Sequence, residues 1–157
     1  LDRIKTILHN DLKKQIISQE EFHTALKCIS ISDDYDMLNG CNMIIEAVYE
    51  DRGLKDLVIS NADELLSKDA IFASNTSTIP ISILAKATTR PKNFIGLHFF
   101  SPVNKMKLVE VIKGKETGSD TLSIALDFVR TIGKQPIVVN DGPGFFTTRV
   151  FQCFKLK

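Results

Sequence analysis

The sequence has few cysteines, almost no net charge and no long apolar run, and each of these absences excludes a class of protein. Its 157 residues include three cysteines, which are too few and too far apart for a disulfide framework or a zinc motif and suit a reducing compartment. The 20 Lys and Arg residues nearly balance the 19 Asp and Glu residues, so no general field attracts nucleic acid or an anionic membrane. No apolar run approaches the roughly 20 residues of a membrane span. We therefore expect no nucleic-acid partner and no membrane span.

A glycine-rich phosphate loop is also missing, because no G-x-G-x-x-G occurs anywhere in the chain. Taken alone, this absence argues against a dinucleotide site, since such loops place backbone N–H groups around the phosphates. At the two ends, Leu1 stands in the middle of an amphipathic pattern and residues 151–157 look like the first turns of a helix. We interpret the chain as a fragment cut at both ends.

Helical and extended patterns alternate along the chain. Helices are expected over 1–12, after the capping box Ser18-Gln-Glu-Glu21, over 52–66, from Pro80, and over 120–132. Strands are expected at 29–32, 43–48, 70–74, 94–99, 108–112 and 136–139. Because strands and helices alternate through short connections, the pattern predicts an α/β layer fold with a largely parallel sheet. The turn-rich Asn140-Asp-Gly-Pro-Gly144 predicts a domain boundary.

His98 is the leading candidate for chemistry, because an open parallel sheet binds its ligands at the carboxyl ends of its strands. Alone, a histidine enclosed by apolar residues is more often a core residue than a catalytic one. Glu110 changes this balance, since it interrupts an apolar run where an acid is costly unless it has a partner. A carboxylate beside the imidazole would fix its tautomer and make a general acid–base pair. The alternative, an exposed Glu110 on an edge strand, stays open.

Two further polar groups lie near predicted strand ends. Asn75-Thr-Ser-Thr78 offers several hydrogen-bonding groups before a helix, which fits either helix capping or a shared role in ligand binding. Glu46 lies in a predicted buried strand and is best explained as a structural carboxylate that caps backbone N–H groups. The cysteines have no basic or histidine neighbour to activate them, and no residue cluster predicts a metal site.

Four motifs stand in order along the chain. They are Ile45-Glu-Ala-Val48 with Glu50 and Lys55, Phe72-Ala-Ser-Asn-Thr-Ser-Thr78, Gly96-Leu-His-Phe-Phe-Ser-Pro102 with Met106-Lys-Leu-Val-Glu-Val-Ile112, and Asp141-Gly-Pro-Gly-Phe-Phe-Thr-Thr-Arg149. Together they resemble the 3-hydroxyacyl-CoA dehydrogenase family, most specifically over 43–149. The resemblance is greatest to the dehydrogenase part of a multifunctional fatty-acid β-oxidation enzyme.

The resemblance implies a Rossmann-type, doubly wound, largely parallel sheet that is truncated at its N-terminal βαβ unit, which carries the Gly-rich loop in this family. It implies a partial NAD-binding domain over 1–141. Residues 142–157 would then be the junction and the start of a C-terminal helical domain. That helical domain would complete the substrate site and mediate a homo-oligomer.

The resemblance also implies an NAD-dependent oxidation of (S)-3-hydroxyacyl-CoA to 3-ketoacyl-CoA, inside a mitochondrion, a peroxisome or the bacterial cytoplasm. His98 would be the catalytic base, Glu110 the carboxylate that orients it, and Ser77 the hydroxyl that contacts the substrate oxygen and the nicotinamide. Residues implied to bind NAD are Ala47, Glu50, Lys55, Asn75, Ser77 and Ser101. Residues implied to contact the acyl-CoA substrate are Ser77, His98 and Thr148.

Two positions depart from the family pattern. Ser101 stands where some members have Asn, and Thr148 stands where many have a substrate-contacting Asn. Two other functions remain open at this stage: a dehydrogenase of another small β-hydroxyacid on the same scaffold, and a catalytically silent fragment.

Overall fold

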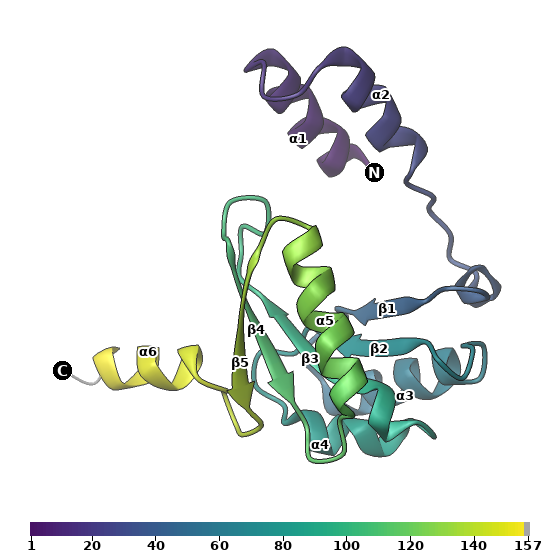
Figure 1. Ribbon diagram of the computed structural model, residues 1–157, viewed down its shortest axis with the longest axis vertical. Coiled ribbons are helices and arrows are strands. Elements are labelled where there is room, and N and C mark those ends of the chain that lie inside the picture. The colour runs from purple at the N-terminus through teal and green to yellow at the C-terminus, as the bar shows by residue number, and fades with distance from the viewer. Residues whose placement is uncertain (156–157) are drawn as a thin grey trace. The chain divides into compact units, whose positions relative to one another are not determined.

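A computed structural model describes residues 1–155 (Figure 1). The chain forms two compact units, of which the first is Leu1–Met37 and the second begins at Leu38. The sequence patterns do not indicate this division, which falls inside the domain predicted over 1–141. No helix in the described part of the chain is long and apolar enough to cross a bilayer.

The first unit is a helical hairpin of α1 (Asp2–Lys13) and α2 (Gln19–Lys27). The predicted capping box is confirmed, because the Glu21 amide donates to Ser18 Oγ at 3.2 Å and the Ser18 amide donates to Glu21 Oε2 at 2.7 Å. The strand predicted over 29–32 is wrong, and these residues have no regular structure. An alternating run this short forms a strand only beside a partner, and none of the described strands pairs with it.

The second unit is built on a five-stranded sheet. Its strands are β1 (Met43–Glu46), β2 (Ile71–Ser74), β3 (Phe94–Phe99), β4 (Leu108–Lys113) and β5 (Gln135–Asn140), arranged in that order. Only the β3–β4 pair is antiparallel. Residues 100–107 join these two strands directly, and a parallel crossover needs a longer connection. The predicted α/β fold with a largely parallel sheet is therefore confirmed.

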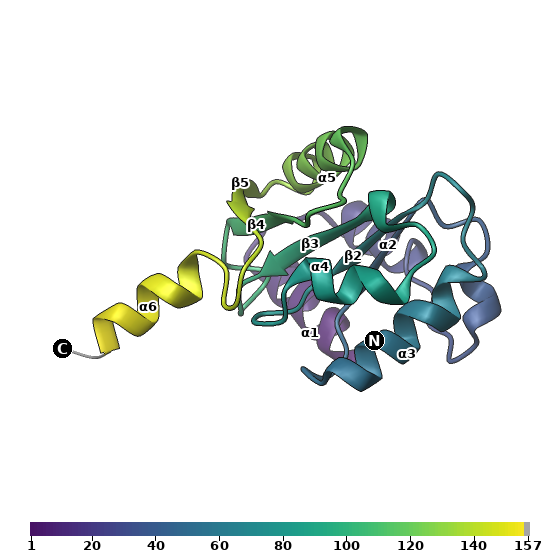
Figure 2. The same cartoon turned by 90° about the horizontal axis from the view of Figure 1, so that it is seen from below.

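Helices cover both faces of this sheet. They are α3 (Arg52–Asp63), α4 (Ile81–Leu84) and α5 (Ser119–Thr131), whereas α6 (Thr147–Lys155) follows β5 and extends away from the sheet (Figure 1 and Figure 2). Short 3₁₀ turns lie at Tyr35–Leu38, Ala85–Ala87 and Pro91–Asn93. Figure 2 shows α5 on one face of the sheet and α3 with α4 on the other. The doubly wound arrangement implied by the resemblance is thus present.

Alternation along the strands divides the apolar core into two clusters. Phe72, Phe94 and Ile112 pack with Ile59 of α3 and Leu84 of α4. The neighbouring strand positions, which include Ala73, Ile95 and Val111, point to the other face and pack against Ala125 and Val129 of α5. Since every second residue of a strand shares a face, positions 98 and 110 lie on the same face as α3 and α4.

Gly96 allows α4 to lie directly on β3. A Cβ atom at this position would be 2.7 Å from Ile81 Cδ1 and 2.8 Å from the Ile112 Cβ atom, closer than real Cβ contacts. The absence of a side chain at Gly96 therefore sets how near the loop and helix after β2 approach the end of β3.

Candidate active site

His98 and Glu110 lie directly opposite each other in the β3–β4 register. His98 Nδ1 is 2.7 Å from Glu110 Oε2. His98 is 7% exposed and Glu110 is 0% exposed, so the pair is held away from water. The predicted pairing of these two side chains is confirmed, and the alternative of an exposed Glu110 on an edge strand is wrong.

The Glu110 carboxylate has three further donors, all from the start of α6. Its Oε1 atom accepts the Phe146 amide at 3.1 Å and the Thr147 amide at 2.8 Å, and its Oε2 atom accepts the Thr147 hydroxyl at 2.9 Å. Because an ionised carboxylate can only accept, the network assigns the proton to His98 Nδ1. Among the described residues no group hydrogen-bonds the other ring nitrogen, Nε2. The lone pair of the His98 Nε2 atom is therefore not used by any group in the described part of the chain.

Aromatic rings and a tight turn surround the imidazole. The ring centre of His98 is 4.6 Å from that of Phe100 and 6.0 Å from that of Phe145. Gly144 and Phe145 have positive φ values of 70° and 48°, which place both in the left-handed region. This turn brings Phe145 against His98 just before α6 begins, and it shields the His98–Glu110 pair.

Glu50 organises the loop that follows β2. Its Oε1 atom accepts the Thr76 hydroxyl at 2.7 Å, and it accepts the Ser77 amide, the Thr78 amide and the Thr78 hydroxyl, each at 2.9 Å. Partial burial raises the pKa of Glu50, but the hydrogen bonds from Thr76, Thr78 and Ser77 outweigh this effect and lower the pKa to about 2. Glu50 is therefore ionised at neutral pH and holds the loop through its charge.

Glu46 and Lys55 form a buried ion pair next to this loop. Lys55 Nζ is 2.7 Å from Glu46 Oε1 and 3.5 Å from Glu50 Oε2, and the Lys55 side chain is 1% exposed. Glu46 also accepts the Val48 amide at 2.7 Å and the Ser74 hydroxyl at 2.7 Å. The structural interpretation of Glu46 is confirmed. Lys55 uses its charge on these two carboxylates, and its contact with NAD stays a prediction.

The other predicted cofactor residues lie at the carboxyl ends of three neighbouring strands. Asn75 follows β2, and its Oδ1 atom accepts the Phe99 amide of β3 at 2.8 Å. Ala47, Ser77 and Ser101 are exposed and follow β1, β2 and β3 in turn. In the part of the chain that the structure describes, no group hydrogen-bonds the Ser77 hydroxyl. This edge thus combines exposed small side chains with a loop that Glu50 and Asn75 hold in place.

The start of α6 contains both a predicted site residue and one that the sequence analysis missed. Thr148 is half-buried, and within the described residues no hydrogen bond joins it to His98 or Glu110. Thr147 binds Glu110 with both its amide and its hydroxyl. Two signals in the sequence were available: a buried acid needs donors, and the first amides of a helix after a Gly-Pro-Gly turn need an acceptor.

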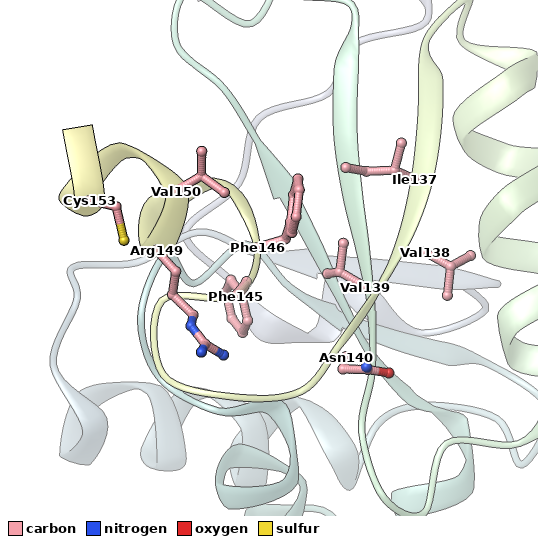
Figure 3. A pocket seen from close by; sticks show the side chains of 9 residues that line it. All are labelled: Ile137, Val138, Val139, Asn140, Phe145, Phe146, Arg149, Val150 and Cys153. Atoms are coloured by element: carbon pink, nitrogen blue, oxygen red, sulfur yellow. The ribbon is translucent and has the colours of Figure 1, made fainter.

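An apolar cavity of about 730 Å³ adjoins this segment (Figure 3). It is lined by residues 137–140 of β5, by Phe145 and Phe146, and by Arg149, Val150 and Cys153 of α6. His98 and Glu110 do not line it. The cavity and His98 therefore both adjoin the turn at Phe145, but His98 is not part of the cavity wall.

A doubly wound α/β sheet with a buried histidine–carboxylate pair at its strand ends defines a cofactor-dependent enzyme domain of the dehydrogenase type. A family model described as "3-hydroxyacyl-CoA dehydrogenase, NAD binding domain" matches residues 1–142. The chain belongs to the 3-hydroxyacyl-CoA dehydrogenase family, as its motifs predict. The matched domain is the one with which this family binds NAD, so NAD is the cofactor.

Relatives of the chain are longer than the chain itself. It is 42% identical over 144 residues to the fatty acid oxidation complex subunit alpha of Colwellia psychrerythraea, an alignment that covers 92% of this chain and 20% of that protein. Among solved structures, FadB2 of M. tuberculosis has a TM-score of 0.93 with 32% identity, over 98% of this chain and 54% of that one. The (S)-3-hydroxybutyryl-CoA dehydrogenase PaaH1 of Ralstonia eutropha has a TM-score of 0.93 with 36% identity, over 96% and 53% of the two chains. The chain thus spans about half the length of these two solved structures.

Proposed function

We propose that this chain forms the NAD-binding part of an enzyme that oxidises (S)-3-hydroxyacyl-CoA to 3-ketoacyl-CoA in fatty-acid β-oxidation. The observation that carries the proposal is the buried His98–Glu110 pair, with Nδ1 held at 2.7 Å and Nε2 left without a partner among the described residues. The printed names of the relatives, a fatty acid oxidation complex subunit and a 3-hydroxybutyryl-CoA dehydrogenase, support the substrate class.

In this proposal His98 is the general base and Glu110 is its positioning carboxylate. His98 Nε2 takes the proton of the C3 hydroxyl while the C3–H bond breaks and the 3-keto group forms. Glu110 keeps the Nδ1–H tautomer and stabilises the imidazolium that results. General acid–base assistance of this kind is worth roughly 10²–10⁴ in rate.

We assign the nicotinamide ring to the exposed residues that follow β1, β2 and β3. Ala47, Ser77 and Ser101 present small side chains there, and the Ser77 hydroxyl is free to bind a ligand atom within the described structure. NAD, when bound, supplies the acceptor for the hydride from C3. We assign Glu50, Lys55 and Asn75 to holding this edge in the shape that NAD requires, and Ser77 and Thr148 to contacts with the acyl-CoA.

The same proposal extends to the whole protein. Residues 1–141 belong to the NAD-binding domain, and 142–157 begin a C-terminal helical domain through which the protein forms a homo-oligomer. The reaction suits a mitochondrion, a peroxisome or the bacterial cytoplasm.

Acetoacetyl-CoA-dependent oxidation of NADH by the intact gene product tests this function. We expect the wild-type protein to be active and His98→Ala to lower kcat by roughly 10²–10⁴, with NADH affinity nearly unchanged. Glu110→Gln should lower kcat less, because the imidazole loses its charged partner and keeps its Nε2 atom. His23→Ala, the same substitution at an exposed histidine of α2, is the matched control and should retain wild-type activity.

Near-normal turnover by His98→Ala would sink the catalytic assignment. If Glu110→Gln changes only the stability of the protein, Glu110 is structural and does not position the base. An inactive wild-type protein that still binds NADH would point to another β-hydroxyacid as the substrate.

A further inference from the structure

We propose that Thr147 is a positioning residue, because its hydroxyl donates to the same Glu110 oxygen that binds His98 and so fixes the carboxylate against the imidazole. Thr147 Oγ1 is 2.9 Å from Glu110 Oε2, and His98 Nδ1 is 2.7 Å from that atom. The inference rests on the proposed function, since it gives Thr147 a part in holding the general base.

The geometry separates the role of the hydroxyl from that of the backbone. The Phe146 and Thr147 amides both bind Oε1, at 3.1 and 2.8 Å. Two donors on one oxygen form a pivot about which the other oxygen, Oε2, can still turn. The Thr147 hydroxyl closes this freedom, because it binds Oε2 from the same residue whose amide binds Oε1.

A helix-capping role alone does not account for this contact. A capping threonine precedes its helix and bonds an amide two or three residues further on. Thr147 is the first residue of α6, and its hydroxyl instead reaches a side chain 37 residues away in the sequence. Glu110 is 0% exposed, so water is poorly placed to take the place of the Thr147 hydroxyl if that hydroxyl is removed. The hydroxyl therefore has no easy substitute.

The start of α6 and the orientation of the Glu110 carboxylate depend on each other. Phe146, which directly precedes α6, and Thr147, its first residue, both hold Glu110. A shift of the first turn of α6 therefore moves the Glu110 carboxylate. Such a movement changes which ring nitrogen of His98 carries the proton. Thr147 makes the geometry of the base depend on how α6 is seated.

Thr147→Val and Thr147→Ser isolate the hydroxyl. Valine keeps the volume, the β-branch and the amide, whereas serine restores the hydroxyl without the methyl group. Thr121→Val is the matched control: Thr121 lies in the first turn of α5, is 5% exposed, and its hydroxyl donates to the Lys92 carbonyl, also at 2.9 Å. The control thus loses a part-buried hydrogen bond of the same length on a helix that covers the opposite face of the sheet from His98 (Figure 2).

Two measurements on the intact gene product decide the proposal: steady-state kinetics with acetoacetyl-CoA and NADH, and the ¹⁵N chemical shifts of the His98 ring nitrogens. We expect Thr147→Val to lower kcat about tenfold, as the loss of one hydrogen bond to a charged group allows, at unchanged KM for NADH, and to mix the Nε2–H tautomer into the ring signals. Thr147→Ser should recover both the rate and the ring signals, and Thr121→Val should keep both.

The proposal is overturned if Thr147→Val keeps wild-type kcat and wild-type ring shifts, or if Thr121→Val lowers kcat as much. If the wild-type protein does not reduce acetoacetyl-CoA, the proposed function fails. The ring nitrogen shifts of Thr147→Val and Thr147→Ser then decide the positioning role by themselves.

Discussion

The two buried carboxylates at this edge of the sheet are stabilised in different ways. Glu46 has a full counter-charge in Lys55, 2.7 Å away. Glu110 has no Lys or Arg partner in the described structure; its neighbours are two backbone amides, the Thr147 hydroxyl and His98. Neutral donors offset the cost of burial but leave the net charge in place. In the proposed reaction, the charge of Glu110 is thus available to stabilise the imidazolium that would form when His98 takes a proton.

The lowered pKa of Glu50 makes the free energy of unfolding depend on pH. The pKa of Glu50 lies at about 2 in the folded chain against an ordinary value of 4.5, so its charge stabilises the fold. A depressed pKa means that this contribution is complete above about pH 4.5 and is lost as the pH falls towards 2. Glu50→Gln should therefore be less stable than wild type at neutral pH, and the difference should shrink as the pH falls below 4.5. Urea unfolding across this range measures it.

Glu116→Gln is the control for this experiment, because Glu116 is exposed and the substitution changes the net charge by the same amount. Its difference from wild type should be small at every pH. Equal pH dependence for the two variants would show that Glu50 does not hold the 76–78 loop by its charge.

At the level of single residues, the sequence predicted those contacts in which one partner is costly without the other. Glu110 in an apolar strand required a partner, and the nearest strand carried His98. The Glu46–Lys55 pair was missed because Lys55 had an alternative use as a ligand contact, and nothing in the sequence shows which way a lysine of an amphipathic helix points. Thr147 was missed because the sequence places it after a turn whose direction depends on two consecutive left-handed residues, Gly144 and Phe145.

Helix starts show the same limit at the level of elements. The caps of α2 and α3 are local: the Glu21 amide donates to Ser18 Oγ, and the Leu54 amide donates to Asp51 Oδ1 at 2.8 Å. Such caps can be predicted from spacing. The start of α4 is different, since Pro80 offers no side-chain cap. The first amides of α4 donate instead to a residue about 60 positions later in the sequence.

Asp141 is that acceptor, and it connects the turn after β5 to the start of α4. Its Oδ1 and Oδ2 atoms accept the Ile81 and Ser82 amides at 2.7 and 2.8 Å, across a separation of 60 and 59 residues. Asp141→Ala should lower the free energy of unfolding by about 1 kcal/mol or more, because it leaves both amides of α4 without a cap. Urea unfolding of the chain checks this value.

Asp141→Asn keeps one side-chain oxygen that can accept, so it should lose less stability than Asp141→Ala. The opposite order, or no loss in either variant, would show that the turn after β5 does not anchor α4. The turn carries Phe145 and Thr147 into the site, and we therefore expect Asp141→Ala also to broaden the ring signals of His98.

For the molecule as a whole, the pattern of alternating strands and helices predicted the fold because each strand has a buried face and each connection is short. The antiparallel β3–β4 pair follows from residues 100–107, which are too few for a crossover helix. The division after Met37 was not predicted, since a strand was expected on each side of it, at 29–32 and at 43–48, and no flexible linker composition separates them. Whether two segments form separate compact units depends on which apolar faces pack together. The periodicity of a helix shows where its apolar face lies, but it does not show which element that face packs against.

Residues 1–157 should bind NADH only weakly by themselves. They contain the exposed edge at β1, β2 and β3, but no G-x-G-x-x-G, so nothing in the sequence supplies the usual cradle for a pyrophosphate. We expect isothermal titration to show NADH binding at least about 100-fold weaker, roughly 3 kcal/mol, than binding by the Ralstonia eutropha dehydrogenase, of which the chain covers 53%. The affinity for nicotinamide mononucleotide should differ much less between the two proteins. This ligand has a single phosphate, and its ring would bind at the exposed residues that include Ser77. If NADH binds to residues 1–157 as tightly as to that enzyme, the chain must hold the pyrophosphate by groups other than a glycine-rich loop. The 76–78 loop held by Glu50 would then be the first place to look, since it follows a parallel strand and has exposed polar side chains.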